Sequence, residues 1–139
     1  MTTESNVTER DQRRMSEITE RDRVYFDLFI TALEGGIGYW SECSAYHWTY
    51  DDEEGDDILG FFARIEDMED GQKYKITRAT IAAGVGKAYE AVKSGRMQNK
   101  YHRRAIKDLK HGDFEDLDYD AETADYIVQC GLFGEAVYG

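Results

Sequence analysis

The spacing of the apolar residues changes twice along this chain, and that change restricts the fold more than any other feature. Between residues 8 and 33 apolar side chains recur at helical spacing, so that Tyr25 and Phe29 share one face. Over residues 45–50 the spacing becomes two, which is typical of a strand. Helical spacing returns after Thr77. The sequence therefore predicts an α+β fold.

The expected elements follow from these patterns and from the turn residues that separate them. A long N-terminal helix is expected to begin near Thr8 and to reach Leu33. Gly35 and Gly36 weaken it, each by about 1 kcal/mol relative to alanine, and we favour a kinked helical continuation over residues 37–43. The remaining expected elements are a short three-stranded antiparallel meander, over residues 45–50, 59–66 and 73–76, and three C-terminal helices, over residues 77–94, 98–111 and 121–134.

Length and composition indicate a single domain. A chain of 139 residues can bury one hydrophobic core, so we expect residues 1–7 to form a flexible tail and residues 8–139 to form one α+β domain. No apolar run is long enough for a transmembrane helix, and the polar N-terminus lacks the apolar region of a secretory signal. Cys43 and Cys130 are too few for a disulfide framework. These features predict a cytoplasmic protein that does not bind membranes.

The charge of the chain is strongly negative and unevenly distributed. The net charge is -12, and most of the 29 acidic residues fall in three segments, 51–57, 66–70 and 113–125. The segment from Lys87 to Lys110 is basic instead. We therefore expect no direct DNA binding, although helices over 77–94 and 98–111 could imitate a helix-turn-helix reader. A basic partner surface is compatible with this distribution, and so is a homo-oligomer that pairs acidic with basic segments.

The stretch LEGGIGYWSECSAYHWTY, residues 33–50, is the densest cluster of glycine and aromatic residues in the chain. Paired glycines let a ligand or another backbone segment approach closely, and tyrosine and tryptophan provide apolar surface with a polar tip. Packing in a core would explain the same aromatic residues. As a binding site the segment would use Glu34, Gly35, Gly36, Tyr39, Trp40, Tyr46 and Trp48.

Other patterns in the sequence suggest chemistry that we weigh against this site. Cys43 and His47 are spaced i, i+4, so on a helix they could form a thiolate–imidazole pair, which makes a small enzyme one alternative. The other alternative, which the acidic segments suggest, is a nucleic-acid mimic that blocks a DNA-binding host protein. GVGK at 84–87 lacks the first glycine and the hydroxyl of a phosphate-binding loop and is better explained as helix packing. The acidic loop at 51–57 lacks the EF-hand spacing, and we expect no metal and no cofactor.

Two motifs resemble a known family. ALEGGIGYWS, residues 32–41, and ADYIVQCGLFGEAVYG, residues 124–139, resemble small uncharacterised accessory proteins encoded by actinobacterial phages. The resemblance implies expression in the cytoplasm of a bacterial host and a role in host takeover or counter-defence. The hypothesis from the sequence is therefore a non-enzymatic phage accessory protein that binds a host protein or a small, nucleotide-like ligand.

Overall fold

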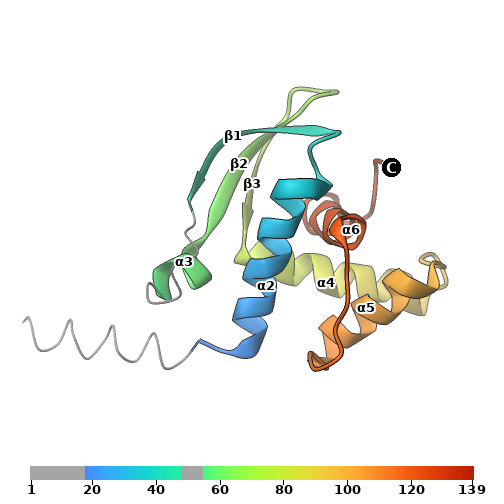
Figure 1. Ribbon diagram of the computed structural model, residues 1–139. Coiled ribbons are helices and arrows are strands. Elements are labelled where there is room, and N and C mark those ends of the chain that lie inside the picture. The colour runs from blue at the N-terminus through green and yellow to red at the C-terminus, as the bar shows by residue number, and fades with distance from the viewer. Residues whose placement is uncertain (1–17, 48–54) are drawn as a thin grey trace, which may run out of the picture.

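The computed structural model describes residues 18–47 and 55–139 (Figure 1). Within these ranges the chain forms an antiparallel sheet and a set of helices, so the predicted α+β class is confirmed. No helix of the described part is long and apolar enough to span a membrane. The elements in chain order are α2 (Glu20–Thr31), the π-helical turn η1 (Ala32–Gly36), β1 (Ser41–His47), α3 (Gly55–Gly60), β2 (Phe62–Asp67), β3 (Lys73–Thr77), α4 (Arg78–Lys93), α5 (Lys100–His111) and α6 (Ala121–Phe133).

The N-terminal helix is shorter at its described end than the apolar spacing predicts. Ile18 and Thr19 are not helical, and α2 begins at Glu20 because Thr19 and Asp22 form a capping box. The backbone N–H of Asp22 donates to the Thr19 hydroxyl at 3.1 Å, and the N–H of Thr19 donates to the Asp22 carboxylate at 3.0 Å. The prediction of one uninterrupted helix from residue 8 to residue 33 is therefore wrong at residues 18 and 19, and residues 1–17 lie outside the described chain.

The predicted helical continuation over residues 37–43 is also wrong. After α2 the chain widens into η1, where the N–H of Ile37 donates to the carbonyl of Ala32 at 2.9 Å. A turn follows in which Trp40 and Ser41 both donate to the carbonyl of Ile37. Strand β1 starts directly at Ser41, so the paired glycines end the helix rather than kink it.

The three strands pair in the order β1-β2-β3, and both pairs are antiparallel, which confirms the predicted meander. The predicted second strand begins too early, because residues 59 and 60 belong to α3 and β2 starts at Phe62. The core-facing side of the sheet carries Ala63, Ile65 and Ile76, all buried. In β1 every residue after Ser41 is exposed, so this strand contributes little to the core.

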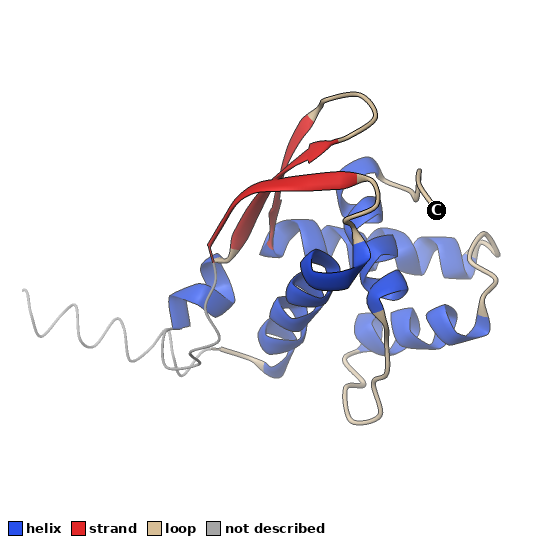
Figure 2. Cartoon of the chain, turned by 45° about the horizontal axis from the view of Figure 1, so that its top comes forward, coloured by secondary structure: helices blue, strands red, loops and turns tan. Residues whose placement is uncertain are grey.

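The helices form the core beneath the sheet, with α5 on the side far from the strands (Figures 1 and 2). Helix α4 buries Ile81, Val85, Ala88 and Val92, and α5 buries Ala105, Ile106 and Leu109, whereas Tyr101 is 39% exposed. Helices α4 and α6 cross closely because small residues meet at the contact. A Cβ at Gly84 would overlap the carbonyl of Ile127, and one at Gly131 would overlap the carbonyl of Thr80. GVGK therefore serves helix packing, as predicted.

Candidate functional site

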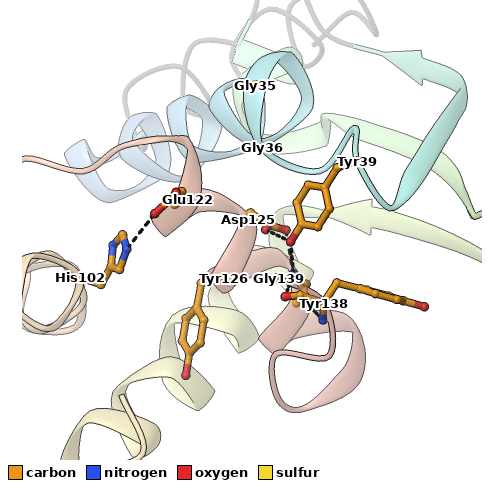
Figure 3. A pocket seen from close by; sticks show the side chains of 10 residues that line it. Gly35, Gly36, Tyr39, His102, Glu122, Asp125, Tyr126, Tyr138 and Gly139 are labelled. Atoms are coloured by element: carbon orange, nitrogen blue, oxygen red, sulfur yellow. Dashed lines mark hydrogen bonds and ion pairs between the residues drawn. The ribbon is translucent and has the colours of Figure 1, made fainter. Parts of the chain in front are cut away.

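A cavity of about 500 Å³ opens where four segments meet (Figure 3). Its volume falls in the range of small-molecule sites. The segments are the end of η1 with the turn after it, the start of α5, residues 122–129 of α6, and the segment that follows α6. The lining residues are Gly35, Gly36, Tyr39, His102, Glu122, Asp125, Tyr126, Gln129, Tyr138 and Gly139.

The glycines of η1 allow one wall of the cavity to approach the start of α6. A Cβ at Gly36 would lie 2.8 Å from the carbonyl oxygen of Ala121, closer than a side-chain carbon can come without displacing backbone. At Gly35 the same atom would lie 3.5 Å from the Cβ of Ala121, which is an ordinary contact. Gly36 is therefore required for the close approach of the two segments, whereas Gly35 is not.

A nearly buried carboxylate, Asp125, organises the floor of the cavity. It is 8% exposed and accepts three hydrogen bonds. The donors are the Tyr39 hydroxyl at 2.6 Å, the Trp40 indole N–H at 2.9 Å and the Gln129 amide at 2.9 Å. Burial, together with the hydrogen bond to Asp125, raises the pKa of Tyr39 to about 12. Tyr39 therefore remains protonated at neutral pH and holds its proton toward Asp125.

The segment after α6 forms a second wall, and Gln129 holds it in place. The Gln129 side chain is buried, and its carbonyl accepts from the backbone N–H groups of Val137 and Tyr138, both at 2.8 Å. The ring of Tyr138 stacks on Trp40 at 5.3 Å, and its hydroxyl donates to Asp67 at 2.6 Å. This hydrogen bond raises the pKa of Tyr138 and lowers the pKa of Asp67. Residues 135–139, which we call the C-terminal strap, thereby connect the cavity to the sheet.

The opposite side of the cavity is formed by His102 and the first turn of α6. The His102 Nδ1 lies 2.7 Å from the Thr123 hydroxyl, and its Nε2 lies 3.5 Å from a carboxylate oxygen of Glu122. Figure 3 shows Glu122 and His102 facing one another across the cavity from Tyr39. Glu122 is largely exposed, so its carboxylate is accessible from solvent at the cavity mouth.

Three of the seven residues expected from the sequence line this cavity: Gly35, Gly36 and Tyr39. Trp40 lies behind the wall as a buried donor to Asp125 and is not part of the lining. Glu34 is exposed and does not line the cavity.

The other two expected residues lie apart from it. Tyr46 is 63% exposed on β1, away from the cavity, and Trp48 lies outside the described residues. The alternation over residues 45–50 cannot distinguish a strand with a buried face from an edge strand that is exposed on both faces.

Asp125 and Gln129 were not predicted as site residues, although the sequence contains a signal for both. They are spaced i, i+4 within the apolar run ADYIVQC, where a helix buries its Ala124, Ile127 and Val128. A charged and an amide side chain on a buried helix face require partners, and such partners are supplied by segments distant in sequence. This pattern was the available indication of the polar centre.

The cysteine and histidine of the enzyme alternative do not share a helix face. Cys43 and His47 both lie in β1, where four residues span about 13 Å. The Cys43 thiol contacts the Ala45 carbonyl at 3.5 Å, and the His47 ring stacks on Phe62. The spacing that suggested a thiolate–imidazole pair therefore has no helical basis.

The chemistry of the lining is acidic and aromatic. Two carboxylates, three tyrosines and one histidine surround the space, and none of the lining residues is lysine or arginine. Within residues 18–47 and 55–139 no group of three or more histidine, cysteine or acidic side chains could hold a metal ion. The cavity therefore suits ligands that donate hydrogen bonds or carry positive charge, and it disfavours phosphate.

Comparison with known proteins does not assign this cavity. No protein family model matches the chain, no curated protein matches it, and no solved structure matches it.

Proposed function

We propose that the protein is a non-enzymatic binding protein that holds a small organic cation in the cavity between Tyr39, Asp125 and Glu122. The observation that carries this proposal is the polarity of the lining, in which carboxylates and phenol rings enclose about 500 Å³ without a lysine or arginine. A concave site of this size suits a small molecule better than the flat contact of a protein partner.

Electrostatics favour a protonated amine or guanidinium group here. A positive charge beside the exposed Glu122 gains about 1 kcal/mol or less because solvent screens the pair, and the nearly buried carboxylate of Asp125 adds to the attraction. Tyr39 and Tyr126 add ring faces and hydroxyl oxygens, which attract and accept from the same kind of group. A nucleotide could offer the amino group of its base to this lining, but its phosphate would face Glu122 and Asp125.

The hydrogen bonding of the site supports binding rather than catalysis. Asp125 already accepts three donors, and His102 is engaged by Thr123 and Glu122. A tyrosine whose pKa lies at about 12 is a weak general acid at neutral pH. The groups of the lining therefore position a ligand more readily than they exchange protons with it.

The resemblance to accessory proteins of actinobacterial phages supports a biological context for this proposal. A small acidic protein made in the host cytoplasm would act by sequestering a host metabolite or signal, in host takeover or in counter-defence. The nucleic-acid mimic receives less support. The described acidic residues around the β2–β3 turn and in the connection from α5 to α6 lie at opposite ends of the molecule and do not form one row (Figures 1 and 2).

Titration with agmatine and putrescine, followed by backbone amide NMR, tests the proposal. We expect either amine to shift the resonances of Gly35, Gly36 and Tyr126, and adenosine monophosphate to shift them less. Glu122→Gln should weaken amine binding by about fivefold, which corresponds to about 1 kcal/mol for an exposed charge.

Glu42→Gln is the matched control, because it removes an exposed carboxylate that does not line the cavity. Equal effects of the two substitutions would contradict the proposal. So would shifts confined to other parts of the molecule, or tighter binding of the phosphate-bearing ligand than of both amines.

A further inference from the structure

The outward face of α5 is basic, although the protein as a whole is acidic. Its inner face buries Ala105, Ile106 and Leu109. The exposed cations of the opposite face are Lys100, Arg103, Arg104, Lys107 and Lys110. None of these five side chains forms an ion pair with a described residue, even though the net charge of -12 provides many carboxylates.

An acidic strip runs along one side of this helix. It is formed by the exposed Asp113, Glu115, Asp116 and Asp118 in the connection from α5 to α6. A cavity of about 590 Å³ is lined both by Arg104 and Asp108 of α5 and by residues 112–116. Further along, burial and the nearby carboxylates of Asp118 and Asp120 raise the pKa of Tyr101. The strip therefore lies beside the helix, and its four carboxylates form no ion pair within the described chain either.

We propose that this two-signed surface is the place where a second copy of the chain docks. A nucleic acid would pair with the five cations but would bring its phosphates close to the acidic strip. An acidic protein partner would meet the same repulsion. A second copy supplies carboxylates for the helix and cations for the strip at the same time, as an isologous two-fold contact requires.

The positions of the charges around α5 select one orientation of the two-fold axis. At 100° per residue, Tyr101 and Asp108 lie toward the acidic strip, whereas Arg103, Lys107 and Lys110 lie on the other side of the outward face. An axis parallel to α5 places the strip of each copy over Arg103, Lys107 and Lys110 of the other. A two-fold axis that lies in the contact plane but runs across α5 would instead place the acidic strip of one copy against the acidic strip of the other. The two α5 helices are therefore parallel in the dimer.

The charged character of the surface determines how the dimer behaves. The strength of exposed ion pairs depends on screening, and the Debye length falls from about 10 Å at 0.1 M salt to about 3 Å at 1 M. Ala105, Ile106 and Leu109 of α5 are already buried within each copy, and Tyr101 is the large apolar side chain of this helix that is exposed. Burial of apolar surface therefore adds little to the stability of the dimer. The dimer is therefore weak and reversible and dissociates as salt is added.

Sedimentation velocity at several protein concentrations, in about 50 mM and about 500 mM sodium chloride, tests this proposal. We expect a dimer at low salt that dissociates at high salt. R103E/K107E should raise the dissociation constant by about tenfold or more, and E115K/D116K should do the same. K87E/K93E on the exposed side of α4 changes the net charge as much as R103E/K107E does, and should leave the dimer largely intact.

The decisive measurement mixes the two charge-reversed variants. R103E/K107E has an acidic helix face and E115K/D116K has a basic strip, so each alone should be monomeric whereas an equimolar mixture should associate. A monomeric wild-type protein at low salt would overturn the proposal, as would a dimer that tolerates both reversals. Binding of a random-sequence DNA duplex through Arg103 and Lys107, without dimer formation, would also overturn it.

Discussion

At the scale of single residues, glycine decides how closely helices pack. Gly84 and Gly86 both lie in α4 and are two residues apart. A side chain at Gly84 would overlap the backbone of α6, whereas the space around Gly86 is open within 4 Å. The requirement for glycine in this helix therefore depends on which side meets another helix, not on helix geometry.

Gly84→Ala should destabilise the protein by about 1–3 kcal/mol, because the added methyl group forces α4 and α6 apart. Gly86→Ala should be neutral or stabilising by up to about 1 kcal/mol, since alanine favours the helix. Urea denaturation of both variants measures the difference. Equal free energies of unfolding would show that the two helices are not in close contact at Gly84.

At the scale of elements, the C-terminal strap fixes one wall of the cavity through a few polar contacts. Its hydrogen bond from Tyr138 to Asp67 can be removed while the stacking on Trp40 is retained. The hydrogen bond lowers the pKa of Asp67 in the folded state. The stability that it contributes is therefore present above the ordinary aspartate pKa of about 3.9, and it is lost as the pH falls through the lower folded-state value.

Tyr138→Phe should therefore reduce the stability of the protein at pH 7. In acid the stabilities of the variant and the wild type should become more similar. Thermal unfolding of both proteins between pH 7 and pH 2.5 measures this convergence. Tyr74→Phe is a control, because its hydroxyl makes no such bond to Asp67 while its ring also packs against the core. A constant difference across the pH range would contradict the role of Asp67.

The elements also show where prediction from the sequence succeeds. Helices α4, α5 and α6 were predicted within a few residues because their apolar spacing and their caps at Thr77 and Asp120 are local signals. The turn after α2 was not, because Trp40 is fixed by Asp125, 85 residues away. Gly35, Gly36 and Tyr39 were predicted as candidates, whereas the carboxylate and amide centre follows from contacts between distant segments.

At the scale of the whole molecule, burial is graded from the helical core to the edge of the sheet. Helices α4 and α6 bury Ile81, Val85 and Ile127 almost completely. Strand β1 has a buried residue at its start, Ser41, but its other residues are exposed on both faces. Local opening free energies follow buried apolar contact, so the same gradient should appear in the dynamics of the chain.

We therefore expect native-state hydrogen exchange to proceed in a fixed order. The amides of β1 near His47 should exchange first, because opening that end exposes little apolar surface. Those near Ser41 should exchange more slowly, since the adjoining Trp40 is held by its bond to Asp125 and by the ring of Tyr138. Amides of α4 and α6 should exchange only on global unfolding. Trp40→Phe removes the indole donor but keeps an aromatic ring, and it should accelerate exchange at the start of β1. The amides of α4 in this variant should still exchange only on its global unfolding. Uniform protection along β1 in the wild type would contradict this gradient and would show that the strand is stabilised by contacts beyond its pairing with β2.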